Sequence, residues 1–152
     1  MVCSWVIPKK AVKTAYSPES TLKMLKNGIL NPHINSLLSR VRHTNTLVIA
    51  DRGFPFWTTI ETVDISLVDG IPTVLQVLNA IKPGFVIGQI YMAEEFLAVN
   101  TEATQKAFAD AIGDVPLHHE PHIEFKTRVP QAVGLIRTAD TIQYANVILV
   151  SA

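Results

Sequence analysis

The sequence predicts an α/β fold, a three-layer α/β/α domain in which helices cover both faces of a largely parallel sheet. Helical and strand patterns alternate along the chain, which is typical of parallel sheets. The run TLVIA at residues 46–50 shows no polar alternation, which indicates a strand buried on both faces. Apolar residues make up 48% of the 152 residues and charged residues 17%. This composition supports a single folded domain with one core.

The N-terminal segment is expected to differ from the rest of the chain. Residues 1–20 show no helical or strand period and contain Pro8 and Pro18. We expect these residues to form a poorly ordered extension or an arm that packs against another subunit. The α/β domain is then expected to span residues 21–152.

The first helix is expected to begin at Asn31, an N-cap residue that is followed by proline. Four apolar residues recur at helical spacing on one face of it: Ile34, Leu37, Leu38 and Val41. The helix should therefore run through residue 41. The buried strand at residues 46–50 follows, and a second, shorter strand is expected at residues 61–65.

The middle of the chain predicts a second helix and a further strand. The turn DGIP at residues 69–72 leads into the helix, again with proline first. The inner face of this helix consists of Val74, Leu75, Leu78 and Ile81. Pro83 and Gly84 end it, and a core strand is expected at residues 85–92.

The C-terminal half predicts one long helix, one short helix and two strands. Asn100 and Thr101 can cap a helix that runs through Ile112. Its expected inner face consists of Ala103, Ala107, Phe108 and Ala111. The remaining expected elements are a short helix at residues 123–127 and strands at residues 133–137 and 146–150.

Charge and cysteine content narrow the class of protein. Lys and Arg total 13, as do Asp and Glu, so the net charge is zero. This balance favours neither nucleic acid nor an anionic membrane as a partner. Cys3 is the only cysteine, which fits a reducing compartment. The chain has neither an apolar run of about 18 residues nor the residue order of a secretory signal, so we expect a cytoplasmic protein.

Two titratable residues flank the strand at residues 46–50. Ligands of an open α/β sheet bind outside the carboxyl ends of its strands, so Asp51 is a candidate binding residue. The alternative is that Asp51 caps the turn after it. His43 titrates near neutral pH and is a candidate acid or base, or it bonds the last carbonyls of the preceding helix. We expect the two side chains to converge on one small polar cavity.

Two further polar segments are candidates for binding. The segment HHEPH, residues 118–122, holds groups that can bind zinc, but Pro121 and the adjacent histidines give a spacing that matches no metal motif. We therefore expect no metal. Tyr144 and Asn146 are two residues apart, so on a strand they would face one side and could bind hydroxyl groups. The alternative is a surface pair on an edge strand. No nucleotide-binding or nucleophile motif is present.

Several segments resemble, in this order, the D-ribose pyranase and L-fucose mutarotase family, and its ribose branch most. The patterns HTxTLVxxDxGxP and YANxIL are the most specific, and the matching segments span about residues 27–150. The matching runs are NGILNPHINSLLSRVRHTNTLVIADRGFP, VDISLVDGIPTVLQVL, AEE, HIEFK, AVGLIRT and YANVIL.

The resemblance implies a small α/β subunit that assembles into rings, often decamers, and interconverts the cyclic forms of a free sugar. The acid–base histidine of the family falls on His43. The substrate-binding residues of the family are an aspartate, a second histidine, and a tyrosine and an asparagine with a backbone contact between them. They fall on Asp51, His122, Tyr144, Ala145 and Asn146.

The implied reaction is the opening and reclosure of a hemiacetal. One group removes the proton of the anomeric hydroxyl while another protonates the ring oxygen. Reclosure through another hydroxyl changes the ring size, and reclosure onto the other carbonyl face changes the anomer. Positioned acid–base groups each contribute roughly 10²–10⁴-fold. No electrons or phosphates move, so the reaction needs no cofactor.

The sequence also departs from the family pattern and leaves alternatives open. Arg52 stands where a small residue is usual, and Ala139-Asp140 replaces the usual Gly-Glu. The loop after Arg52 is more aromatic than usual, with Phe54, Phe56 and Trp57. The first alternative function is a sugar-binding or regulatory relative without turnover. The second is a metal-dependent hydrolase built on HHEPH.

Overall fold

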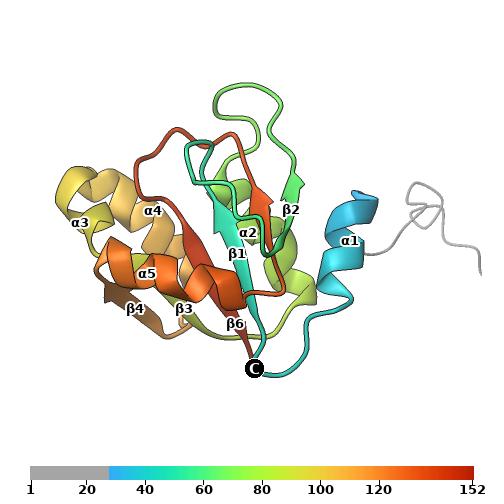
Figure 1. The fold of residues 1–152 in the computed structure, drawn as a ribbon. Coiled ribbons are helices and arrows are strands. Elements are labelled where there is room, and N and C mark those ends of the chain that lie inside the picture. Colours follow the sequence, from blue (N-terminus) through green and yellow to red (C-terminus); the bar gives the residue numbers. More distant parts are fainter. Residues whose placement is uncertain (1–27) are drawn as a thin grey trace, which may run out of the picture.

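One mixed sheet organises the protein, of which the computed structural model describes residues 28–152 (Figure 1). Its six strands lie in the order β2-β5-β1-β6-β3-β4. In chain order the strands are β1 Thr46–Ala50, β2 Glu61–Asp64, β3 Ile87–Ala93, β4 Leu117–Glu120, β5 Gly134–Arg137 and β6 Val147–Ser151. The helices are α1 Pro32–Leu38, α2 Val74–Ile81, α3 Glu95–Val99, α4 Glu102–Ile112 and α5 His122–Arg128, with 3₁₀ turns η2 Lys82–Gly84 and η3 Val129–Gln131. The extension expected at residues 1–20, and the start of the domain expected at residue 21, lie outside the described residues.

The direction of β6 sets it apart from the other strands. β1, β2 and β5 are parallel to one another, as are β3 and β4, whereas β6 is antiparallel to both of its neighbours, β1 and β3. The predicted α/β class is confirmed, with a sheet that is mixed rather than uniformly parallel. Because β6 runs against the other five strands, it begins at the sheet edge where they end. The connections that follow those strands therefore meet the connection that precedes β6.

Side-chain caps begin the predicted helices. The Asn31 side chain accepts hydrogen bonds from two backbone N–H groups in the first turn of α1, as expected, although α1 ends at Leu38 rather than at residue 41. α2 begins after Thr73, which forms a capping box with Gln76. The prediction that proline would be the first residue of α2 is wrong, because Thr73 occupies the N-cap position and Pro72 precedes it.

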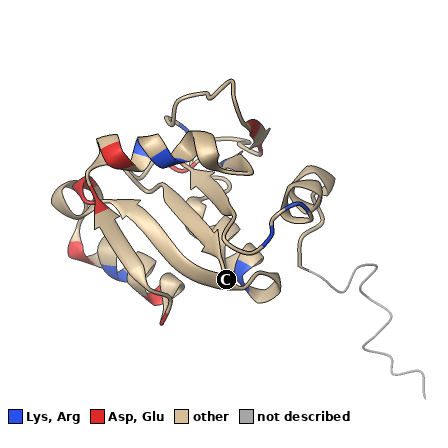
Figure 2. Ribbon diagram, turned by 60° about the horizontal axis from the view of Figure 1, so that its bottom comes forward, with Lys and Arg blue, Asp and Glu red and all other residues tan. Residues whose placement is uncertain are grey.

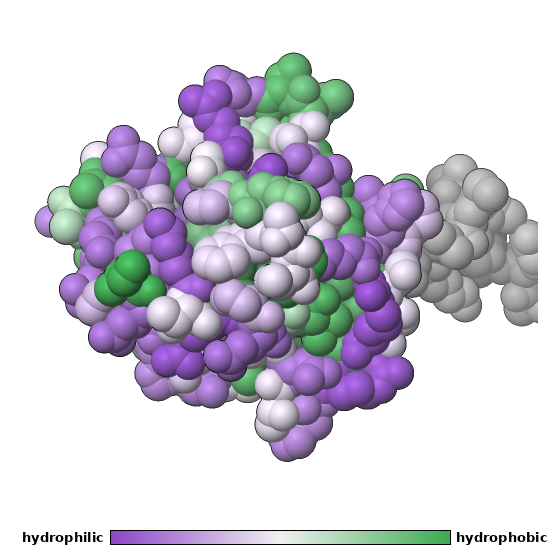
Figure 3. All heavy atoms as spheres, in the orientation of Figure 1, coloured by the Kyte–Doolittle hydropathy of each residue, from purple (hydrophilic) through white to green (hydrophobic). Residues whose placement is uncertain are grey.

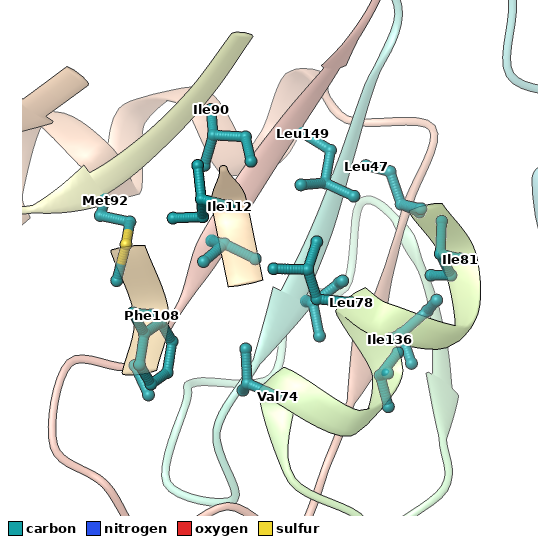
Figure 4. Close-up of a cluster of buried hydrophobic side chains, with 14 of the residues drawn as sticks. Leu47, Val74, Leu78, Ile81, Ile90, Met92, Phe108, Ile112, Ile136 and Leu149 are labelled. Atoms are coloured by element: carbon teal, nitrogen blue, oxygen red, sulfur yellow. The ribbon is translucent and has the colours of Figure 1, made fainter. Parts of the chain in front are cut away.

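The side chains of β1 alternate between two hydrophobic clusters on opposite faces of the sheet. Leu47 and Ile49 belong to the larger cluster and Val48 and Ala50 to the smaller one, and all four are fully buried. The predicted burial of this strand on both faces is confirmed. Figure 4 shows the larger cluster, in which strand residues meet α2 and α4: Leu47, Ile90, Met92, Ile136 and Leu149 from the strands, Val74, Leu78 and Ile81 from α2, and Phe108 and Ile112 from α4.

The smaller cluster attaches α5 to the other face of the sheet. Phe125 of α5 and Val129 of η3 pack with Leu135 and Ile148 of the strands. Phe54, from the connection after β1, belongs to the same cluster, and its ring centroid lies 6.1 Å from that of Phe125. This packing therefore fixes α5 and the connection after β1 next to each other.

Two observed elements, α3 and β4, have no counterpart in the sequence prediction. α3 has five residues, and β4 is an edge strand of four that pairs with β3 alone, so neither is long enough to show a clear period. In α4, Ala103 and Ala107 are exposed, and the buried residues are Phe108 and Ile112. Alanine tolerates exposure, so its spacing does not identify a buried face.

Charged side chains and one group of exposed apolar side chains occur on the described surface. Lys, Arg, Asp and Glu lie mainly on the helices and connections around the sheet (Figure 2). Hydrophobic atoms gather at the top of the molecule (Figure 3), where Figure 1 places the connection from β2 to α2. This connection exposes Leu67, Val68 and Ile71. None of the helices within residues 28–152 is long and apolar enough to cross a membrane.

Gly134 provides a test of the packing between β5 and α1. A Cβ atom at this position would lie 2.6 Å from Leu37 Cδ1 and 3.0 Å from the Glu61 carbonyl oxygen. We expect Gly134→Ala to lower the free energy of unfolding by about 1–3 kcal/mol, measured by urea denaturation. Gly84→Ala is the control, because a Cβ there meets no atom within 4 Å. Equal stability of the two variants would contradict this account of the packing.

Candidate functional site

A hollow of about 360 Å³ lies at the edge of the sheet where five strands end and β6 begins. Three segments line it: the connection after β1, the helix α5 after β4, and the connection before β6. The lining residues are Asp51, Gly53, Phe54, Pro55, His122, Lys126, Gln143, Tyr144 and Asn146. The reversed direction of β6 is what brings the third segment to this edge.

Asp51 and Asn146 join the first and third segments through a pair of hydrogen bonds. The Asp51 backbone N–H donates to Asn146 Oδ1 over 2.8 Å, and Asn146 Nδ2 donates to Asp51 Oδ2 over 2.9 Å. The Gly53 backbone N–H donates to the other carboxylate oxygen, Asp51 Oδ1, over 2.9 Å. At least one lone pair of the carboxylate remains for a further donor.

The environment of Asp51 raises the pKa of its carboxyl group. Burial is the largest cause, and the negative charge of Asp140 adds to it. The hydrogen bonds from Asn146, Gly53 and Phe54 lower this pKa but do not offset the burial. Asp51 is therefore a stronger base than a solvent-exposed aspartate.

His122 is held among aromatic rings at the start of α5. Its ring centroid lies 5.0 Å from that of Tyr144 in an edge-on arrangement and 6.0 Å from that of Phe125. Its backbone N–H donates to both carboxylate oxygens of Glu95, over 2.9 and 3.1 Å. Its side-chain Nδ1 is buried and has no hydrogen-bond partner among the described residues.

The pKa of His122 lies below its ordinary value. Burial is the largest cause, and the positive charge of Lys126 adds to it, against the opposing effects of Glu95 and Asp51. The imidazole is therefore neutral at pH 7, with one ring nitrogen that donates a hydrogen bond and one that accepts. The site thus pairs a carboxyl group with a neutral imidazole.

Tyr144 reaches the hollow by a different backbone path from the one predicted. It precedes β6 and has a left-handed φ of 57°. The prediction that Tyr144 and Asn146 lie on one strand and therefore face the same side is wrong. Both side chains nevertheless line the hollow. Ala145, between them, is fully buried in the larger cluster and does not line the hollow.

The expected convergence of His43 and Asp51 within one chain is wrong. His43 precedes β1 and Asp51 follows it, so a strand of five residues separates them, roughly 16 Å at the usual rise per residue. The neighbouring Thr44 backbone N–H donates to the Ser151 carbonyl at the far end of β6. His43 therefore lies at the sheet edge opposite the hollow.

The histidines of HHEPH have separate locations. His118 stacks on Tyr91 with ring centroids 5.0 Å apart, and His119 lines another hollow, beside Met92 and Phe96. Only His122 of this segment lines the hollow with Asp51. Within residues 28–152, no group of three or more His, Cys, Asp or Glu residues is arranged to hold a metal ion.

Comparison with known proteins identifies the relatives of this chain. The model of the RbsD / FucU transport protein family matches residues 24–152. The chain belongs to this family. A D-ribose pyranase of Geobacillus thermodenitrificans is 41% identical over 126 residues, which cover 83% of this chain and 95% of the relative. A D-ribose pyranase of Halalkalibacterium halodurans is 37% identical over 126 residues, with the same coverage of 83% and 95%.

Solved structures of RbsD and of a fucose mutarotase share the fold. Bacillus subtilis RbsD complexed with D-ribose superposes with a TM-score of 0.79 at 30% identity and covers 85% of this chain and 98% of its own. The fucose mutarotase of Streptococcus pneumoniae, in complex with L-fucose, has a TM-score of 0.71 at 19% identity, over 86% and 98% of the two chains. The resemblance predicted from the sequence motifs is confirmed.

Sequence reasoning on this RbsD / FucU member omitted part of the hollow. Lys126 lies four residues after His122 on α5, a spacing that places both on one helix face and could have revealed it. Gly53 and Pro55 were expected to shape the loop over Asp51, but neither they nor Phe54 were predicted as binding residues. Gln143 had no recognisable signal.

Asn146 can be tested through its effect on Asp51. Asn146→Ala removes the hydrogen bond that lowers the Asp51 pKa, so we expect this pKa to rise further. The Asp51 backbone N–H loses its acceptor, which should lower the free energy of unfolding by about 1–3 kcal/mol. Carbon-13 NMR of the Asp51 carboxyl group against pH, with urea denaturation, measures both effects.

Asn35→Ala is the matched control for this variant. It removes a side-chain hydrogen bond to the Ile29 carbonyl in another part of the molecule. It should reduce stability and leave the Asp51 titration unchanged. An Asp51 pKa that does not rise in Asn146→Ala would contradict the interpretation that the Asn146 hydrogen bond lowers this pKa.

Two substitutions of charged residues near His122 should shift its pKa in opposite directions. Lys126→Met removes a positive charge, so the His122 pKa should rise, whereas Glu95→Gln removes a negative charge, so it should fall. Proton NMR titration of the imidazole measures both shifts. Two shifts in the same direction would show that changes in burial, rather than these charges, control the imidazole.

Proposed function

We propose that this chain is a sugar mutarotase of the D-ribose pyranase type. It interconverts the cyclic forms of a free, ribose-like monosaccharide, between pyranose and furanose or between anomers, by acid–base ring opening without a cofactor. The observation that carries this proposal is the hollow in which Asp51, His122, Lys126, Tyr144 and Asn146 converge. The relatives named D-ribose pyranase and the RbsD structure complexed with D-ribose support it.

The residues of the hollow suit the recognition of a polyhydroxylated ring. Asp51 accepts hydrogen bonds from sugar hydroxyls, and Asn146 holds this carboxylate in place. Neutral His122 and the phenol of Tyr144 each donate and accept, and the backbone of Ala145 lies between the two polar side chains of its segment. Several partners are needed because each buried hydroxyl without one costs about 1–3 kcal/mol.

We propose that the acid–base residue, His43, enters the hollow from a second copy of the chain. His43 and the hollow lie at opposite ends of β1, so we infer a head-to-tail contact that brings His43 of one copy to Asp51 of the next. Repeated head-to-tail contacts form a ring when the rotation between copies closes, which fits the expected cytoplasmic decamer of three-layer α/β/α subunits. Two apolar side chains next to the hollow, Phe56 at 67% and Ile123 at 72% exposure, would be covered by such a neighbour.

The activity is tested by NMR saturation transfer between the ring forms of D-ribose. We expect the protein to accelerate exchange and His43→Ala to reduce this acceleration by at least about 10²-fold, because the proton-transfer group is lost. His33→Ala, an exposed position on α1, is the control. Ribose binding without faster exchange would instead identify a sugar-binding relative without turnover, and a panel with fucose, galactose and allose would define the preferred sugar.

The shared site predicts complementation between two inactive variants. In mixed assemblies of His43→Ala and Asp51→Asn chains, a site with both native groups forms where the first variant supplies the hollow and the second supplies His43. Random mixing at equal amounts should restore about a quarter of the sites. No recovery in rings co-assembled from both variants, or a monomeric mass in light scattering at micromolar concentration, would refute the shared site.

A further inference from the structure

Asp140 is a buried carboxylate with no role in the proposed reaction so far. It is 2% exposed, and both of its oxygens accept backbone hydrogen bonds. Oδ2 accepts from Val74 N over 2.8 Å, and Oδ1 accepts from Ile142 N over 2.9 Å. Val74 is the first residue of α2, where the partial positive charge of the helix favours an anion. Asp140 therefore ties the start of α2 to the segment that leads to Tyr144 and Asn146.

The residues on both sides of Asp51 are bonded to the same short segment. The Arg52 backbone N–H donates to the Asp140 carbonyl over 3.1 Å. The Thr138 hydroxyl donates to the Ala50 carbonyl over 2.9 Å and accepts from the Asp140 backbone N–H over 3.1 Å. The backbone on either side of Asp51 is thus fixed by residues 138–140.

The two carboxylates also share a space. A smaller hollow of about 150 Å³ adjoins the hollow that Asp51 and His122 line, and both Asp51 and Asp140 line the smaller one. Asp51, Gly53 and Gln143 line both hollows. Asp140 therefore lines the smaller hollow beside Asp51, whereas His122 and Lys126 line the larger one.

We propose that Asp140 is a positioning residue of this site: its carboxylate fixes the segment that leads to Tyr144 and Asn146 to the start of α2. Its backbone carbonyl joins the same segment to the loop after Asp51. The assignment of this geometry to sugar binding rests on the proposed function. A second, electrostatic effect follows from the same placement, because the buried anion beside Asp51 favours the protonated form of Asp51 and so makes it a stronger base.

The charged groups around Asp51 come from three directions. Asp140 faces it from the segment before β6 and raises its pKa. His122 and Lys126 face it from α5, across the larger hollow, and Arg52 follows it in its own loop. Arg52 is paired with Asp69, Glu95 bonds the His122 backbone, and Tyr144 faces the larger hollow from the segment before β6. Asp140 is the negative charge that raises the Asp51 pKa, so loss of this charge should lower it.

The test compares Asp140→Asn with Thr138→Val. Both variants remove hydrogen bonds from residues 138–140, but only the first removes a charge. Carbon-13 NMR of the Asp51 carboxyl group, recorded against pH without sugar, should show a lower midpoint in Asp140→Asn and the wild-type midpoint in Thr138→Val. Because no sugar is present, this readout stays valid even if the proposed function fails.

The positioning effect is measured as D-ribose affinity by NMR titration. We expect Asp140→Asn to weaken binding by about tenfold or more, since misplaced Tyr144 and Asn146 lose at least one hydrogen bond to the sugar. Asp140→Ser, which also removes the charge but keeps a small acceptor, is the second variant should the first not fold. An Asp51 midpoint that does not fall, or wild-type ribose affinity, in a folded variant overturns the proposal. Failure of both variants to fold also overturns it, since Asp140 would then support the whole fold rather than this site.

Discussion

The hydrogen-bonded pair of Asp51 and Asn146 depends on the direction of one strand. β6 lies between β1 and β3 and runs antiparallel to both, so its first residues stand beside the last residues of its neighbours. A parallel β6 would place Asn146 at the opposite edge, far from Asp51. The aromatic contacts of His122 and the position of Tyr144 rest on the same arrangement, because both side chains reach the hollow from connections at this edge.

Burial then gives these residues their chemical character. It raises the pKa of the Asp51 carboxyl group and lowers that of the His122 imidazole, which brings both groups toward the neutral form. Nearby charges adjust each of them: Asp140 acts on Asp51, and Lys126 acts on His122. The hollow offers acceptors on Asp51 and groups that both donate and accept on His122 and Tyr144, which matches the hydroxyl groups of a polyol.

The sequence predicted those helices and strands whose ends or burial are marked by a local residue pattern. Asn31 marked the start of α1, and the unbroken run at residues 46–50 marked a strand buried on both faces. β4 and α3 gave no such signal because both are short and lie at the border of the sheet. The motifs selected four residues that line the hollow. The separation of His43 from Asp51 could also have been predicted, because the two residues flank a strand of five residues that the sequence itself indicates. The sequence identified Asp140 only as a departure from the family pattern. Its hydrogen-bond partners are the backbone N–H groups of Val74 and Ile142, and a backbone group leaves no residue-specific signal in a sequence.

The placement of His43 and the hollow at opposite ends of β1 has a genetic consequence under the proposed assembly. Damage near residue 43 would leave the altered chain with an intact cavity of its own and impair the cavity of the adjacent copy. In a cell that makes both native and altered chains, each native His43 would still complete one cavity, on a native or on an altered copy. The number of complete sites would therefore equal the number of native chains, and such a lesion would be recessive in its effect on total activity.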